Sequence, residues 1–340
     1  MKTLSALFVV IASGISIAAS AAGGYHLLET VSVAGDEGWD HPTVDTAGRR
    51  LYVSHGSHVV VMDVDSGKLV GKIEKTPGVH AIAIVPELGR GFISNGQANS
   101  VTIFNPKTLE TIGEVKVTGV NPGPIIYDPP TKRVFTFNGG SSNATAIDAR
   151  EGNVVGTIDL GGTRELAASD AKGHVFVNLV DKNVVLRIDS RTLTAGERWP
   201  LGTCERPGTM AIDQKNGRLF IGCGNRLMTI LDSNDGRLIT TLPIGEGRDQ
   251  AEFDPETHLV FSSNGEGTVT VIRQESPDKY SVLETVKTAP GARTMALDLK
   301  THKIFLPLAD FAPAPAPTPE NPRPRGRIIS GTFRILILGM

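Results

Sequence analysis

A pattern of about 42 residues recurs seven times along this 340-residue sequence. In its clearest form it is a short apolar run, an aspartate, a polar turn, a basic residue or histidine, and a second apolar run, as in Ala211-Ile-Asp-Gln-Lys-Asn-Gly-Arg-Leu-Phe-Ile. The aspartate, or the residue in its place, stands at Asp45, Val85, Asp128, Asp170, Asp213, Asp254 and Asp298. A period of this length indicates repeated modules that bury their apolar surfaces against one another.

Two further apolar runs follow in most copies, which predicts four strands per repeat. The third runs include Val59-Val-Val-Met and Val269-Thr-Val-Ile, and the fourth include Leu238-Ile-Thr-Thr-Leu. Turns such as Asp63-Val-Asp-Ser-Gly67 separate them, since aspartate binds nearby backbone amides and glycine accepts positive φ. Four antiparallel strands at this period are typical of a propeller blade, so we expect an all-β, seven-bladed β-propeller.

The two ends of the chain predict how the ring closes. The seventh copy supplies three strands, the last within Phe333–Met340. The segment Tyr25-His-Leu-Leu-Glu-Thr-Val resembles the fourth strand of copy six, Tyr280-Ser-Val-Leu-Glu-Thr-Val. We therefore expect the N-terminal strand to complete the last blade and remove its open edge.

Residues 1–21 have the features of a signal peptide. Lys2 precedes an apolar run from Leu4 to Ile17, which contains Ser13, Gly14 and Ser16 and is followed by Ala19-Ser-Ala. The run is shorter than the roughly 20 residues of a membrane-spanning helix. We expect residues 22–340 to form one monomeric domain, periplasmic or secreted, without a membrane span. The formal net charge of −2 gives no broad basic face and argues against a nucleic-acid partner.

The frame around Leu51-Tyr-Val-Ser and the turn from Asp63 to Lys68 resemble the YVTN family of β-propeller repeats, the YncE-like exported proteins. The resemblance covers essentially the whole chain after the signal peptide. It implies the fold, whereas its repeats share no catalytic motif. Related propellers include metal-dependent lactonases, quinoprotein dehydrogenases and binding proteins, so the fold does not select a function.

The repeat also predicts which residues meet. We call the loop that leads into the first strand of each blade the leading loop; it and the turn between the second and third strands belong to one face, the mouth. Five residues before the seven repeat positions stand Asp40, His80, Gly123, Glu165, Gly208, Asp249 and Arg293. Five of these seven are ionisable, which packing alone would not require.

These polar residues allow two interpretations. One is a solvated mouth whose groups satisfy each other. The other is a site for a divalent metal such as Ca, Mn or Zn, held by Asp40, His80, Glu165 and Asp249, with His41 or His55 as the catalytic base of a hydrolase or lactonase.

The ends of the second strands give a second set of candidates. Asn95, Asn138 and Asn264 each precede glycine, and His55 takes the same place in blade one. Asn-Gly is typical of hairpin turns, and the alternative is that these amides bind a ligand at the mouth. His58, further along the turn, is expected to be exposed.

Four arginines belong to leading loops and indicate an anionic partner. They are Arg164, Arg206, Arg248 and Arg293. The first hypothesis is therefore a binding or scaffold protein of the cell envelope, whose mouth takes a small anionic ligand or a protein. The metal-dependent hydrolase is second, and a quinone oxidoreductase is last.

Cys204, in the leading loop of blade five, and Cys223, at the end of its second strand, are expected to form a disulfide, since export permits one. A free or metal-binding pair is the alternative. Residues 311–326 form a proline-rich loop within the last blade. Dense prolines favour polyproline II over a sheet, so this loop is either a lid or partner-binding edge at the mouth, or a surface loop without a role.

Overall fold

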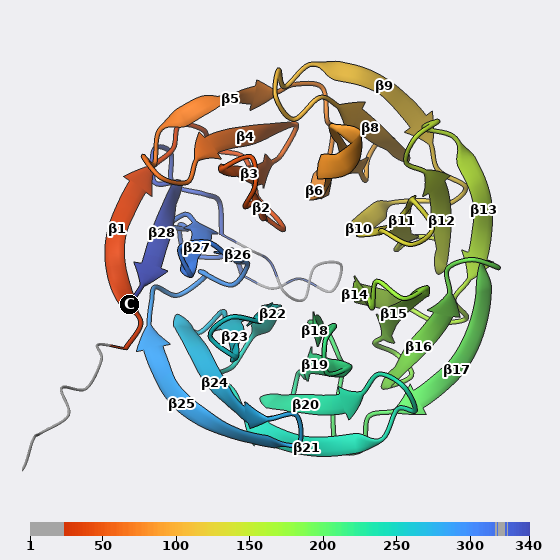
Figure 1. The fold of residues 1–340 in the computed structure, drawn as a ribbon. Helices are drawn as coiled ribbons and strands as arrows, with labels where there is room; N and C mark the ends of the chain where they lie inside the picture. The colour runs from red at the N-terminus through yellow and green to blue at the C-terminus, as the bar shows by residue number, and fades with distance from the viewer. Residues whose placement is uncertain (1–23, 317, 319–323, 325) are drawn as a thin grey trace, which may run out of the picture.

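The computed structural model describes residues 24–316, 318, 324 and 326–340, so the predicted signal peptide lies outside the described residues. The described chain forms seven four-stranded antiparallel sheets and one short 3-10 helix, η1 (Pro86–Leu88). Figure 1 shows the sheets arranged as blades around a common axis. The predicted seven-bladed β-propeller is confirmed.

Six blades take their strands from consecutive parts of the chain. Blade one contains β2 (Thr43–Asp45), β3 (Arg50–His55), β4 (His58–Asp63) and β5 (Leu69–Ile73). Blade two contains β6 (Val79–Val85), β7 (Arg90–Asn95), β8 (Ser100–Phe104) and β9 (Thr111–Lys116). Blade three contains β10 (Pro122–Asp128), β11 (Arg133–Asn138), β12 (Asn143–Asp148) and β13 (Val154–Asp159).

The next three blades follow the same order. Blade four contains β14 (Arg164–Ser169), β15 (His174–Leu179), β16 (Val184–Asp189) and β17 (Thr194–Pro200). Blade five contains β18 (Ala211–Asp213), β19 (Arg218–Gly222), β20 (Leu227–Asp232) and β21 (Leu238–Pro243). Blade six contains β22 (Arg248–Asp254), β23 (Leu259–Asn264), β24 (Thr268–Ser276) and β25 (Lys279–Lys287).

Blade seven joins the two ends of the chain. Its strands are β26 (Ala296–Asp298), β27 (Lys303–Leu308), β28 (Arg334–Gly339) and β1 (His26–Ser32). β1 pairs antiparallel with β28, with Thr30 opposite Leu336, and lies on the outside of the ring (Figure 1). The predicted closure by the N-terminal strand is therefore confirmed.

The apolar core lies between neighbouring blades. Leu51 and Val53 of blade one pack with Phe305 and Ile335 of blade seven, and all four are almost completely buried. The second and third strands face a blade on each side, which explains their nearly continuous apolar runs. The outer strands alternate, as in β13, where partly or fully buried residues alternate with exposed ones.

At the face opposite the mouth, three of the repeated aspartates bond to a different blade. Asp298 accepts two hydrogen bonds of 2.8 Å from Arg49, which links blade seven to blade one. Asp128 accepts a 2.6 Å bond from Ser169 of blade four, and Asp254 a 2.6 Å bond from His302 of blade seven. At these three positions the aspartate therefore connects two blades.

Candidate functional site

The leading loop and the turn between the second and third strands are joined at the mouth. The N–H of Gly56 donates to the carbonyl of Gly38 over 2.8 Å, and Gly96 donates to Gly78 over the same distance. Gly139 and Gly265 make the corresponding bonds to Asn121 and Gly247, each 2.9 Å long. The two loops that the repeat assigns to one face therefore touch in these four blades.

Glycine is required at two of these turns by close approach. Neither Gly96 nor Gly139 has positive φ, so neither forms the expected Asn-Gly hairpin turn. A Cβ atom at Gly96 would lie 2.6 Å from Nε2 of His80, and one at Gly139 would lie 2.6 Å from a guanidinium nitrogen of Arg164. These residues still begin the hairpin connections from β7 to β8 and from β11 to β12, and the glycines there make room for mouth side chains.

Asp40 is the centre of a hydrogen-bonded group of blades one and two. Nδ1 of His80 donates to its Oδ2 over 2.7 Å, and Nε2 of His41 lies 3.4 Å from its Oδ1. Burial raises the pKa of Asp40, but the charge of His41 and the hydrogen bond from His80 outweigh it and hold the pKa below its usual value. Asp40 is therefore ionised at neutral pH.

A second chain of contacts crosses the ring from blade one to blade six. Nδ1 of His41 lies 2.8 Å from Oε1 of Gln250, whose Nε2 donates to Glu252 over 3.2 Å. Burial lowers the pKa of His41, but the charges of Asp40 and Asp249 prevail and raise it. Burial raises the pKa of Glu252 to about 7. The sequence did not single out Gln250 or Glu252, although both lie near the repeat position of blade six.

Arg164 and Arg248 occupy matching places in two pairs of blades. A Cβ at Gly123 would lie 2.5 Å from a terminal nitrogen of Arg164, and one at Gly208 would lie 2.4 Å from Cζ of Arg248. Gly123 and Gly208 are the two glycines that interrupt the ionisable series in the leading loops. They are small because the arginine of the following blade lies against them.

Both guanidinium groups have N–H donors that bind no acceptor among the described residues. Arg164 donates to the carbonyl of Asn121 over 3.3 Å, and Arg248 donates to the carbonyl of Arg206. The Nε atoms of Arg164 and Arg248 are buried without a hydrogen-bond partner. Among the described residues, no carboxylate lies within the 4.0 Å of an ion pair with either group. Burial lowers the pKa of both arginines, and the charge of Glu165 opposes this effect on each of them.

The other predicted arginines differ from these two. Arg293 forms an ion pair of 3.4 Å with Asp249. Arg206 is exposed, and its backbone N–H donates to Asn183 over 2.8 Å. Burial, together with the charge of Asp249, raises the pKa of Glu165, which carries its own electrostatic interaction with Arg164. The mouth is therefore a mixed surface in which Arg164 and Arg248 are partly buried cations that form no ion pair within 4.0 Å among the described residues and interact with Glu165 at longer range.

The predicted metal ligands are not gathered into one coordination sphere. Asp40 pairs with His80 and Asp249 pairs with Arg293, while Glu165 interacts with Arg164. Within the described part of the chain, the four do not form a group of ligand atoms lying within 4.8 Å of one another. Since charged partners already satisfy them, the geometry does not favour the metal-dependent hydrolase.

The three candidate asparagines are buried inside their blades. Asn95 donates from Nδ2 to Thr102 over 2.8 Å, and Asn138 to Thr145 over 3.0 Å. Asn264 donates to Thr270 over 3.1 Å. Each amide nitrogen thus connects the second strand to the third, while the side-chain oxygens of Asn95 and Asn138 are buried without a hydrogen-bond partner in the described chain.

Blade one also contains a pair of histidines, His55 and His58, whose environments differ from those predicted from the sequence. His55 is completely buried against Phe333, at a ring-centroid distance of 4.5 Å, so it does not face the mouth as an open catalytic base. His58 is 9% exposed, and its predicted exposure is wrong. The segment around Glu37 covers it, with Nδ1 of His58 lying 3.6 Å from Oε2 of Glu37.

The sulfur atoms of Cys204 and Cys223 are bonded to each other. The bond fixes the leading loop of blade five to its second strand. Arg206, two residues after Cys204, supplies the carbonyl to which Arg248 donates. The disulfide therefore supports the backbone on which Arg248 rests.

Two cavities adjoin the mouth residues. One of about 310 Å³ follows the axis of the ring and is lined by first-strand residues together with His41, Gln250 and Glu252. The other, of about 830 Å³, is lined in part by Trp39, Arg293 and Phe311. Phe311 pairs with Ile328 at the base of the proline-rich loop, so the base lies at the mouth; residues 317, 319–323 and 325 lie outside the described residues.

Solved structures with the same architecture cover nearly the whole chain. The structure of U3-55K has a TM-score of 0.76 at 10% identity and covers 92% of this chain and 99% of that one. The RRP9 WD40 repeats have a TM-score of 0.74 at 9% identity, covering 91% and 96%. A chain of a mitotic checkpoint complex has a TM-score of 0.73 at 12% identity, covering 90% and 96%. These similarities show the β-propeller fold.

No protein-family model matches the sequence, and no curated protein is significantly similar to it, so the resemblance to the YVTN repeats stays an expectation. Across the described residues, no helix has the length and apolarity to cross a membrane.

Proposed function

We propose that this chain is an exported binding protein of the cell envelope whose mouth takes a small anionic ligand through Arg164 and Arg248. The observation that carries the proposal is the state of these two guanidinium groups. Each lies in a place that the glycine of the preceding blade leaves open, each has a buried Nε without a partner, and neither has a carboxylate at ion-pair distance among the described residues.

The chemistry of arginine defines the ligand class. A guanidinium group presents several N–H donors in a planar fork that matches a carboxylate or a phosphate. Arg164 and Arg248 each use few of these donors within the chain. Partial burial strengthens the attraction for an anion, because water screens the charges less there. A ligand with two carboxylates or phosphates could engage both residues.

The surroundings support a binding role. Asp40 and Asp249 are already paired with His80 and Arg293, so their charges are partly compensated and repel an anion less. The glycines leave room for the two arginines, and the disulfide fixes the backbone beneath Arg248. An acidic segment of a protein partner is the second ligand class, since one similarly folded chain belongs to a protein complex.

The test is calorimetric titration of the purified protein with inorganic phosphate and with citrate at constant ionic strength. We expect the double variant Arg164→Gln/Arg248→Gln to lose more than about tenfold in affinity, because charge-assisted hydrogen bonds are lost. Arg150→Gln, at the exposed turn after β12, is the matched control and should bind as the native protein does. Equal affinities of the native protein and the double variant would contradict the proposal.

An oligo-aspartate peptide distinguishes the two ligand classes. If it binds much more tightly than citrate and is equally sensitive to the double variant, the partner is an acidic protein segment. If citrate or phosphate binds at least as tightly, the ligand is a small anion.

A further inference from the structure

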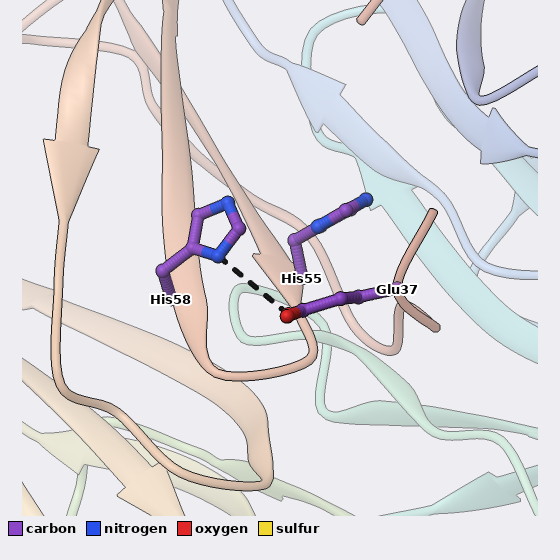
Figure 2. Close-up of side chains that lie close together, drawn as sticks. All are labelled: Glu37, His55 and His58. Carbon is purple, nitrogen blue, oxygen red and sulfur yellow. Dashed lines mark ion pairs between the residues drawn. The ribbon is translucent and has the colours of Figure 1, made fainter. Parts of the chain in front are cut away.

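Glu37, His55 and His58 form a cluster at the junction of blades one and seven. His55 ends β3, His58 begins β4, and Glu37 belongs to the leading loop of blade one. One ligand atom from each lies within 4.8 Å of the other two, and no other set of three potential metal ligands in the described chain meets that condition. Figure 2 shows the ring of His58 and the carboxylate of Glu37 pointing toward each other beside His55.

The histidines of this cluster have unused nitrogen atoms. Both ring nitrogens of His55 are buried without a hydrogen-bond partner, and the side chain is completely buried. Nε2 of His58 is likewise buried and unpartnered. Buried polar groups are nearly always hydrogen-bonded, so three such atoms in neighbouring rings call for a specific explanation.

Burial is the largest influence on the pKa of both imidazole rings. Burial, with the charge of His58, lowers the pKa of His55 to about 4, and burial also lowers the pKa of His58. The charges of Lys72 and Glu74 on the neighbouring chain segment act on His58 in opposite directions.

We propose that Glu37, His55 and His58 bind a divalent transition-metal ion of the zinc class. Two imidazoles and one carboxylate form a three-ligand set that zinc uses while keeping a fourth position for water. Ligand atoms at about 2.0–2.1 Å from a tetrahedral ion lie roughly 3.3 Å apart, and Nδ1 of His58 already lies 3.6 Å from Oε2 of Glu37. The imidazole majority favours zinc, nickel, copper or cobalt over calcium or magnesium.

A metal at this site would stabilise the contact between blades one and seven, where the ring closes. The leading loop of blade one runs from β1, the outer strand of blade seven, to β2, the inner strand of blade one. Asp36 in this loop accepts hydrogen bonds from Ser330 and Gly331 of blade seven. A metal bound to Glu37 and both histidines would add a link from the loop to the β3–β4 turn. This role is separate from anion binding at Arg164 and Arg248.

Zinc titration of the untagged protein tests the proposal. The chain is stripped with chelator, dialysed, and titrated with zinc chloride against a chromophoric competitor. We expect one tightly bound equivalent. Glu37→Gln and His58→Gln should each weaken zinc binding by more than about tenfold, since removal of even an outer-sphere partner costs 10–100-fold. Glu37 is half exposed, so its variant leaves the fold intact.

A matched control and a second readout separate this site from surface histidines. His26→Gln alters an exposed histidine of β1 and should bind zinc as the native protein does. Zinc should also raise the thermal midpoint of the native protein and of His26→Gln, and not that of Glu37→Gln. The proposal is overturned if the native protein takes up no zinc, or if Glu37→Gln and His58→Gln retain its affinity.

Discussion

Nδ1 of His41 and Oε1 of Gln250 lie 2.8 Å apart, although the residues are separated by 209 positions and belong to blades one and six. The contact connects blades on either side of blade seven. Since Nε2 of the same ring faces Asp40, both nitrogens have acceptors. This arrangement favours the imidazolium form, because only that form donates from both nitrogens.

The first prediction concerns the pKa of His41. Burial lowers it, and the negative charges of Asp40 and Asp249 outweigh burial to raise it above 6.5. Asp40→Asn should therefore lower the pKa of His41, because the larger opposing charge is gone while burial remains. The measurement is an NMR titration of the His41 ring in both proteins. An unchanged pKa would show that Asp40 does not control this ring.

The second prediction concerns the glycine under Arg248. In Gly208→Ala the new Cβ would lie 2.4 Å from Cζ of Arg248 and would displace the guanidinium group toward solvent. We expect about tenfold weaker phosphate binding and a stability loss below roughly 1 kcal/mol, because only the end of a flexible side chain moves. Gly113→Ala, where a Cβ meets no atom within 4 Å, is the control for titration and urea unfolding. A large loss of stability with unchanged binding would contradict this assignment.

The third prediction concerns pH. Burial raises the pKa of Glu252 from 4.5 to about 7, so the folded protein holds a proton there that the unfolded chain releases. Between these values the contribution of Glu252 to stability falls as pH rises, by at most about 3 kcal/mol. Glu252→Gln should remove this part of the pH dependence. Urea unfolding at pH 5 and pH 8 measures it, with exposed Glu151→Gln as the control, whose pH dependence should match that of the native protein.

The fourth prediction concerns the disulfide. Cys204 and Cys223 are 19 residues apart, and a closed loop of that size contributes roughly 3 kcal/mol to the free energy of unfolding. Cys204→Ala/Cys223→Ala should unfold at lower urea concentration and bind phosphate more weakly, because the backbone under Arg248 loses its support. Reductant should destabilise the native protein and leave the double variant unchanged. Equal stabilities of the two would exclude a structural role for the bond.

The repeat predicts the ring because every copy repeats the same strand and turn pattern. Aligned copies also place Asp40 and His80 in corresponding loops, and the structure joins them directly. The alignment says which loops meet, but it does not say which side chain partners which. Arg164 precedes Glu165, the aligned residue of blade four, and its guanidinium group lies against Gly123 of blade three. A contact between two blades of this kind cannot be predicted from the sequence of one copy.

The cluster of Glu37, His55 and His58 could not be predicted from the repeat. Glu37 lies outside the aligned frame, so comparison with other copies gives it no partner. His58 is buried because the β3–β4 turn is tight, which sets His58 opposite His55, and because the leading loop covers both. Residues 33–42 cover the two histidines because this loop connects β1 of blade seven to β2 of blade one.

The pairing of β1 with β28 means that blade seven is the last blade to fold during synthesis. β1 cannot pair until β28 has been synthesised. The other six blades can therefore form before blade seven is complete. A chain cut short before Arg334 would keep an unpaired edge on that blade and remain open to pairing with other chains. We therefore expect such a shortened chain to associate with other copies through that edge.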